Sequence, residues 1–203
     1  MNFIQNTFNL PKRIVRRVEH ELVRPKYNGK VFCLGFNKTG TTSFGEAMKL
    51  MGYRHSSFNT KVWRKHYQKN DLISILKYTA KFDSLDDLPW LKEDMIPVLD
   101  KAFPNSKFVY LERNENSWKT SMYNWTYHMT GKYPDMEQKL KEYKEHRAFV
   151  FEYFDGRSPK EFITLDISQK NAIETLATFL NCPKPSAPMP HANKTPNIVS
   201  SEF

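Results

Sequence analysis

The sequence predicts a three-layer α/β domain with a mainly parallel central sheet, and three observations support this fold class. Short apolar runs at residues 31–36, 107–112 and 162–166 are typical of buried strands. Segments with helical spacing of apolar residues separate these runs, and strands that alternate with helices favour a parallel sheet. The first run ends in a glycine-containing loop that leads into a helix. A chain of 203 residues is long enough for one such domain with a sizeable core.

The other elements follow from apolar spacing and from the start and stop signals along the chain. The spacing predicts helices over residues 42–51, 59–68, 71–80, 91–103, 116–130, 135–154 and 168–180. Pro97 falls inside the fourth of these, where we expect it to interrupt the helix. The carboxylate-rich segment KFDSLDDLPW (81–90) predicts a short strand or turn. Residues 182–203 hold five of the 12 prolines and predict a loop.

Residues 1–29 are expected to form a basic N-terminal helical extension, and residues 30–203 the single domain. Ile14, Val15, Val18 and Leu22 recur at helical spacing, with lysines and arginines around them. A basic amphipathic helix of this kind can lie on an anionic membrane surface, or it can pack on its own domain with a solvated basic face. We favour the second arrangement.

The charge balance indicates an anionic partner. Lys and Arg number 31 against 22 Asp and Glu, a formal net charge of +9. Nucleic acid, anionic lipid, a phosphorylated cofactor and an acidic glycan all fit this balance. Cys33 and Cys182 are too few for a disulfide framework, so a reduced compartment is expected. The first residues lack the apolar core of a signal peptide, so we expect a cytoplasmic protein, peripheral at the inner face of the membrane if the N-terminal helix binds lipid.

The stretch GFNKTGTTSF (35–44) differs from a nucleotide-binding P-loop in the position of its lysine. The pattern G-x-x-x-x-G-K-[ST] requires a lysine directly after Gly40, where this chain has Thr41. Its lysine, Lys38, lies between Gly35 and Gly40. The two glycines allow a tight bend that turns backbone amides toward an anion, and the start of the next helix favours negative charge. The context predicts a P-loop NTPase-like topology whose loop suits one phosphate with a transferable group beside it.

The longer stretch GFNKTGTTSFGEAMKLMGY (35–53) resembles the 5′-phosphosulfate loop of sulfotransferases that use 3′-phosphoadenosine 5′-phosphosulfate (PAPS). It is most similar to the short bacterial branch with a [KR]-T-G-T-[ST]-S loop and a following L-G-Y. The resemblance implies a set of residues that bind the 5′-phosphosulfate: Lys38, Thr39, Gly40, Thr41, Thr42 and Ser43. It also implies that Lys38 stabilises charge on the bridging oxygen as the sulfuryl group leaves.

A second signature accompanies the loop. In these enzymes an arginine that ends a strand and a serine eight residues later, in the next helix, both bind the 3′-phosphate. The stretch KFVYLERNENSWKTS (107–121) places Arg113 and Ser121 at that spacing. An arginine can bind a phosphate through two hydrogen bonds, and a helical hydroxyl can add a third. The alternative is a surface ion pair between Arg113 and a neighbouring Glu112 or Glu115.

The resemblance extends from about residue 30 to residue 194. Near its end, PMPHANK (188–194) resembles an F-P-H-x-N element in the loop that closes over the cofactor, with Met189 where phenylalanine is usual. Lys194 would then reach the 3′-phosphate, and an ordinary lysine of the tail is the alternative.

Transfer of a sulfuryl group to a hydroxyl requires a general base near the sulfur. The segment 81–90 resembles a D-x-x-x-D-x-P element of the family, with Asp83 and Asp87 at the matching positions. Asp87 is the first candidate and Asp83 the second, and the two could act together. A turn or a helix cap before Pro89 is the structural alternative. His55, His66 and His128 are further candidates outside any matched motif. No metal is expected, because a sulfuryl group carries less charge than a phosphoryl group.

The acceptor is expected to be a carbohydrate or glycolipid, because the family often uses such substrates, although a small phenol or alcohol also fits. Nucleic acid is not expected as a partner. The segment 117–133 is rich in aromatic residues, which can stack on sugar rings or on an aromatic acceptor. Tyr123, Tyr127 and His128 are the candidates for contact with the acceptor. Trp118, Trp125 and Met129 share a helical face, so we expect them in the core.

Two other classes of function remain open from the sequence. A P-loop kinase or NTPase would use Mg-ATP, with Asp166 at the end of the third strand as a metal ligand. The missing lysine after Gly40 counts against it. A non-enzymatic module that binds nucleic acid or membrane fits the charge, but it leaves the glycine loop and the Arg113/Ser121 pair without an explanation.

Overall fold

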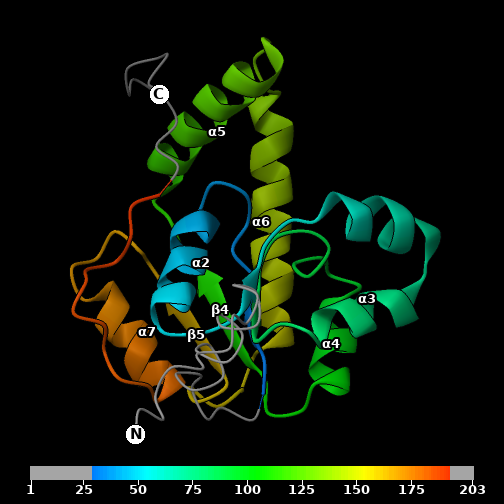
Figure 1. The fold of residues 1–203 in the computed structure, drawn as a ribbon. Helices are drawn as coiled ribbons and strands as arrows, with labels where there is room; N and C mark the ends of the chain where they lie inside the picture. Colours follow the sequence, from blue (N-terminus) through cyan, green and yellow to red (C-terminus); the bar gives the residue numbers. More distant parts are fainter. Residues whose placement is uncertain (1–28, 193–203) are drawn as a thin grey trace, which may run out of the picture.

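The computed structural model describes residues 29–192, so the expected N-terminal helix and Lys194 lie outside the described residues. A five-stranded sheet forms the centre of the domain (Figure 1). Its strands are β1 (Val31–Cys33), β2 (His55–Ser56), β3 (Ser84–Leu85), β4 (Lys107–Leu111) and β5 (Phe162–Leu165). They pair in the order β2-β3-β1-β4-β5, and every pair is parallel. The predicted three-layer α/β class with a parallel sheet and a P-loop NTPase-like topology is confirmed.

Helices cover both faces of the sheet. They are α2 (Thr41–Leu50), α3 (Leu72–Thr79), α4 (Ile96–Ala102), α5 (Glu115–Thr130), α6 (Met136–Tyr153) and α7 (Ala172–Leu180), with a π-helical turn η1 (Val62–His66) and a 3-10 turn η2 (Tyr67–Lys69). Side chains alternate between the two faces along each strand. On β1, Val31 and Cys33 pack in a cluster with α2 and α7, whereas Phe32 packs in a second cluster with α3, α4 and α6. None of the helices within residues 29–192 combines the length and apolarity needed to cross a bilayer.

Two helices, α5 and α6, extend beyond the sheet as an antiparallel arm (Figure 1). The Trp118 and Tyr143 rings stack between them at a centroid distance of 4.6 Å. Trp118 also donates from Nε1 to the carbonyl oxygen of Asn37 at 2.8 Å. Because Trp118 is fully buried, burial of its ring and this hydrogen bond both hold α5 against the glycine loop.

Several elements differ from their predicted form. The helix predicted over residues 91–103 begins only at Ile96, with Pro97 in its first turn. Proline lacks an amide hydrogen that the first turn of a helix does not use, so it starts this helix instead of interrupting it. The segment predicted as a helix over residues 59–68 is a π turn followed by a 3-10 turn. The two-residue strand β2 was not predicted, and Met129 is 63% exposed, so its assignment to the core is wrong.

Candidate functional site

A cavity of about 990 Å³ opens at the edge of the sheet where the strands end. The residues that line it come from the glycine loop with the start of α2, Phe58, Asp87 with Leu88, the segment from Arg113 along one face of α5, the turn after β5, and His191 with Ala192. The carboxyl ends of parallel strands share one edge, and ligands of α/β proteins bind there. The cavity volume is in the range of small-molecule sites.

The glycine loop leaves no space for a Cβ at two positions, and at one of them the backbone also favours glycine. At Gly40 φ is +109°, and a Cβ would lie 2.1 Å from Cδ1 of Ile167. A Cβ on Gly35 would lie 2.6 Å from Oγ1 of Thr39. Gly40 is also the N-cap of α2 and gives that helix no side-chain cap. The first turn of α2 therefore presents its amides and its partial positive charge at the cavity wall.

Two cations lie in the cavity wall. Arg113 donates from Nη1 to the carbonyl oxygen of Lys38 at 2.7 Å, so the end of β4 is joined to the glycine loop. Desolvation lowers the pKa of Lys38, and the positive charge of Arg113 lowers it further. Desolvation also lowers the pKa of Arg113, and Asp166 partly opposes this shift. Holding two desolvated cations close together is unfavourable without an anion, so this wall is suited to bind one.

One face of α5 also lines the cavity. Ser117, Ser121 and Asn124 recur at intervals of three or four residues, so they face the same side of the helix, and all three line the cavity. The structure thus brings Ser121 and Arg113 to the same cavity as the glycine loop. Trp125 lies beside them, with its ring centroid 5.4 Å from Nζ of Lys38.

A carboxylate also reaches the cavity. Asp87 has φ of +62°, a conformation that is rare for a residue with a side chain and that clusters at functional sites. Its Oδ1 accepts a hydrogen bond from the amide of Leu88 at 2.6 Å. Desolvation raises the pKa of Asp87 to about 6, with a further contribution from the negative charge of Asp86. A carboxylate with this pKa is a stronger proton acceptor than an exposed aspartate.

The structure does not bring Asp83 into the cavity. Both of its oxygens are engaged by the guanidinium of Arg54, at 3.1 Å from Nε and 3.2 Å from Nη2. The amide of Arg54 donates to it as well, at 2.9 Å. These contacts join the residue before β2 to the residue before β3. The contacts of Asp83 therefore stabilise the fold.

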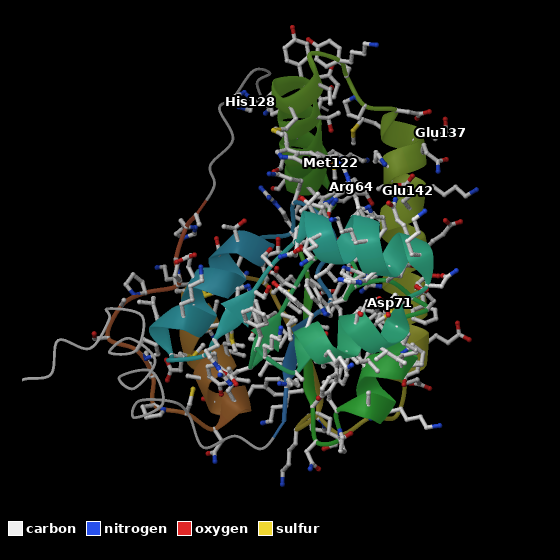
Figure 2. All side chains as sticks on the ribbon, turned by 45° about the vertical axis from the view of Figure 1, so that its right-hand side comes forward. Arg64, Asp71, Met122, His128, Glu137 and Glu142 are labelled. Atoms are coloured by element: carbon white, nitrogen blue, oxygen red, sulfur yellow. The ribbon has the colours of Figure 1, made fainter. Side chains whose placement is uncertain are left out.

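The predicted acceptor residues Tyr123, Tyr127 and His128 are not among the described residues that line the cavity. Tyr123 and Tyr127 stack instead on Tyr133, at centroid distances of 4.4 and 4.6 Å. Figure 2 shows His128 near the outer end of α5. Among the other candidate histidines, His55 is buried between α2 and β3, and His66 pairs with Asp71 at 3.0 Å.

Sequence reasoning missed several residues that do line the cavity. They include Phe58, Asn114, Ser117, Asn124 and His191, and Trp125 was assigned to the core. Helical spacing counted from Ser121 would have identified Ser117, Asn124 and Trp125. No such signal exists for Phe58, because it lies in an irregular segment. Within residues 29–192, no three His, Cys, Asp or Glu side chains converge in a group that could hold a metal ion.

Comparisons with known proteins bear on the family and on the fold of this chain. A family model described as a sulfotransferase domain matches residues 30–136, which include the glycine loop, Asp87, Arg113 and Ser121. No match was found among curated proteins. Among solved structures, the chain is similar to a gluconokinase from Sinorhizobium meliloti 1021, with a TM-score of 0.51 and 18% sequence identity. The similarity covers 77% of this chain and 94% of that chain, and at this identity it shows the fold alone.

Proposed function

This chain belongs to the sulfotransferase family, and we propose from that premise that it moves a sulfuryl group from PAPS to an acceptor hydroxyl. The observation that carries the proposal is the convergence of Lys38, Arg113, Ser121 and Asp87 on one cavity. The family places the chain among transferases. The identity of the donor, the roles of the residues and the nature of the acceptor are our inferences.

The residues present fit the donor. Its two anionic ends are separated by a nucleoside, and the cavity offers two separate groups of anion-binding residues. The glycine loop and the first turn of α2 would hold the 5′-phosphosulfate through backbone amides, hydroxyls and Lys38. Arg113 and Ser121 would hold the 3′-phosphate. The donor supplies the sulfuryl group when it is bound.

Two side chains would assist the transfer of the sulfuryl group. Asp87 would accept the proton of the acceptor hydroxyl as that oxygen forms its bond to sulfur. Lys38 would stabilise the negative charge that builds on the bridging oxygen as the bond between sulfur and that oxygen breaks. The base role goes to Asp87 and not to Asp83, because Asp83 is held by Arg54 outside the cavity.

The part of the cavity near Asp87 would hold the acceptor. Phe58, 47% exposed, and the half-buried Trp125 bring aromatic rings to the cavity, and Asn124 adds an amide. Aromatic faces with a few polar groups suit a sugar ring, which stacks through its C–H face and hydrogen-bonds through its hydroxyls. This arrangement supports a carbohydrate or glycolipid acceptor.

A kinase or NTPase remains the second candidate because Asp166 lines the same cavity at the end of β5. Its Oδ1 accepts hydrogen bonds from the amide and the hydroxyl of Ser168, at 2.9 and 2.7 Å. Nε2 of Gln169 donates to its Oδ2 at 3.4 Å, so both oxygens have donors. Thr41 stands where a kinase needs its lysine. Both observations favour the sulfotransferase.

Calorimetric titration with adenosine 3′,5′-bisphosphate, with and without Mg²⁺, tests the proposal. We expect binding that does not depend on Mg²⁺ and that weakens about 10- to 100-fold in Lys38→Ala and Arg113→Ala, because each loses a charge-assisted hydrogen bond. Arg64→Ala and Lys65→Ala remove exposed cations from η1, outside the cavity, and are matched controls; Arg64 is labelled in Figure 2. Binding of Mg-ATP in place of the bisphosphate would establish the kinase instead.

A further inference from the structure

The chain between β2 and β3, residues 57–82, folds into a hairpin of η1, η2 and α3 that we call the basic hairpin. It carries six lysines and arginines and a single acidic residue, Asp71. All six cations are exposed: Lys61, Arg64, Lys65, Lys69, Lys77 and Lys81. They are brought into one region because η1 contacts both η2 and α3. Figure 2 turns the hairpin forward and labels Arg64 on η1 and Asp71 before α3.

The cations of the basic hairpin lack counter-charges. Within residues 29–192 none of the six forms an ion pair. Asp71 has partners of its own: its Oδ1 accepts a hydrogen bond from the amide of Ser74 at 3.1 Å, and its Oδ2 lies 3.0 Å from Nδ1 of His66. Every lysine and arginine of α5 and α6, by contrast, pairs with a glutamate, namely Lys119, Lys139, Lys141, Lys144 and Arg147. Like charges gathered without counter-charges repel one another, so this surface favours an anionic partner.

The same surface exposes two adjacent aliphatic side chains at the start of α3. Leu72 is 39% exposed and Ile73 is 68% exposed. Because α3 packs on the domain through the buried Ile75 and Thr79, its outer side carries Ile73 and Lys77, which are one turn apart. Lysines that attract anionic headgroups, beside aliphatic side chains that enter the acyl boundary, are the chemistry of a surface that binds a bilayer. A soluble polyanion such as nucleic acid or an acidic glycan would use the cations alone.

The hairpin is anchored to the domain, so its outer side has a fixed direction. Val62 is buried in the core cluster on one face of the sheet. The ring of Trp63 stacks on that of Tyr67 at a centroid distance of 4.7 Å, and the hydroxyl of Tyr67 donates to Asp94 at 2.9 Å. Phe58, at the start of the hairpin, lines the cavity. The basic hairpin therefore begins beside the cavity and would hold it near the surface to which the hairpin binds.

We propose that the basic hairpin docks this protein on a bilayer that contains anionic lipid. The six cations supply the attraction to the phosphate headgroups, which salt screens. Leu72 and Ile73 enter the boundary between the headgroups and the acyl chains. Docking would bring the Phe58 side of the cavity toward the lipid surface, and it does not depend on which group the protein transfers.

Co-sedimentation of the full chain with lipid vesicles tests the proposal. We expect binding to vesicles of phosphatidylcholine mixed with phosphatidylglycerol, little binding to phosphatidylcholine alone, and weaker binding at high salt. The triple variant Lys65→Gln, Lys69→Gln, Lys77→Gln removes one cation each from η1, η2 and α3 and should bind the mixed vesicles about tenfold or more weakly. Ile73→Ser removes the most exposed aliphatic side chain of the hairpin and should weaken binding about threefold or more.

Matched controls make the same changes elsewhere on the molecule. Lys132→Gln, Lys160→Gln, Lys170→Gln removes three exposed lysines outside the hairpin, and Met129→Ser removes a side chain of α5 that is 63% exposed. Both should bind the mixed vesicles far more tightly than the corresponding hairpin variants. Equal losses in the two triple variants would show that net charge or another segment binds the lipid, and would overturn the proposal. A wild type that does not distinguish the two kinds of vesicle would overturn it as well.

Two further measurements separate the remaining outcomes. If the hairpin triple variant loses binding to heparin and to vesicles alike while Ile73→Ser changes neither, the surface binds an acidic polymer and the proposal is wrong. Acetylation of lysines in the wild type, read by mass spectrometry, needs no variant. Mixed vesicles should protect the lysines of the basic hairpin more than Lys132, Lys160 and Lys170. Equal protection of the two groups overturns the proposal even if a variant fails to fold.

Discussion

Arg113 Nη1 donates a hydrogen bond to the carbonyl oxygen of Lys38 at 2.7 Å, across 75 positions of sequence. Arg113, two residues after the end of β4, thereby fixes the backbone of the loop that follows β1. Lys38 itself has φ of +70°, so the loop is held in an uncommon conformation that directs its lysine at the cavity. One arginine can therefore serve both proposed phosphate sites, through contact with the loop on one side and with the 3′-phosphate on the other.

Arg113→Lys tests this double role. A lysine keeps the charge, but it cannot hold the carbonyl of Lys38 and bind a phosphate through a planar guanidinium. We expect affinity for adenosine 3′,5′-bisphosphate to fall about tenfold, measured by calorimetry. Arg64→Lys makes the same change on an exposed turn and should bind as the wild type does. Equal affinities in the two variants would show that charge alone suffices at position 113.

Gly40→Ala should disrupt the loop. The alanine would have to hold φ of +109° and would place its Cβ 2.1 Å from Ile167. We expect a loss of about 3 kcal/mol or more in the free energy of unfolding by urea, together with loss of bisphosphate binding. Gly131→Ala is the matched control, because φ is +68° there and a Cβ would meet no atom within 4 Å. It should cost about 1 kcal/mol and leave binding intact.

Asp87 should make stability fall as pH rises. Its pKa is raised to about 6 in the fold from a reference value of 3.8, so between these values the unfolded chain releases its proton first. The folded state loses relative stability over that window, by about 3 kcal/mol in total, and the penalty is complete above pH 6. Below pH 3.8 both states hold the proton and the contribution vanishes.

Asp87→Asn isolates this effect. It should raise the free energy of unfolding at pH 7 relative to the wild type, and the difference should shrink toward pH 4. If Asp87 is the base, the same substitution abolishes transfer, and wild-type activity rises with pH through about 6. Urea titrations of both proteins at several pH values make the comparison. A variant that is less stable than the wild type at pH 7 would contradict the burial of an ionised Asp87.

Trp118→Phe should loosen the contact between α5 and the glycine loop. Phenylalanine keeps an aromatic ring against Tyr143 but cannot donate to the carbonyl of Asn37, which Trp118 does at 2.8 Å. We expect a loss of about 1 kcal/mol in unfolding free energy and weaker bisphosphate binding. Trp63→Phe is the control. It changes a tryptophan of η1 whose ring stacks on that of Tyr67 at a centroid distance of 4.7 Å, and it should leave bisphosphate binding unchanged.

The parts of the fold that the sequence predicts are those that depend on local patterns. The apolar runs at β1 and β4 are visible because both strands are buried on both faces, and the glycine loop is visible because its close contacts restrict the residue type. The run at β5 is visible although this edge strand is only partly buried. The two-residue strand β2 carries no such pattern. Its place at the edge of the sheet is fixed by pairing with β3, a contact between distant segments.

The candidate site follows the same division. Arg113 and Ser121 are only eight residues apart, just after the end of β4 and in the following helix α5, so their spacing can be recognised in the sequence. The structure places both side chains at the cavity. The choice between Asp83 and Asp87 depends on Arg54, 29 positions before Asp83, and on the positive φ of Asp87. Neither can be read from a motif. The acceptor candidates Tyr123, Tyr127 and His128 were chosen by residue type. The side chains of α5 that reach the cavity are instead those on the same helix face as Ser121.

The space that Gly45 leaves for His55 links two positions that are ten residues apart in the chain. An alanine at position 45 would favour the helix, but it is excluded while the imidazole fills that volume. Were position 55 smaller, the alanine would become acceptable and even stabilising. The two substitutions should therefore be strongly epistatic: Gly45→Ala is damaging alone and tolerated in a chain that also carries His55→Ala. A designer who raises helix content at α2 would thereby remove the histidine's place between α2 and β3.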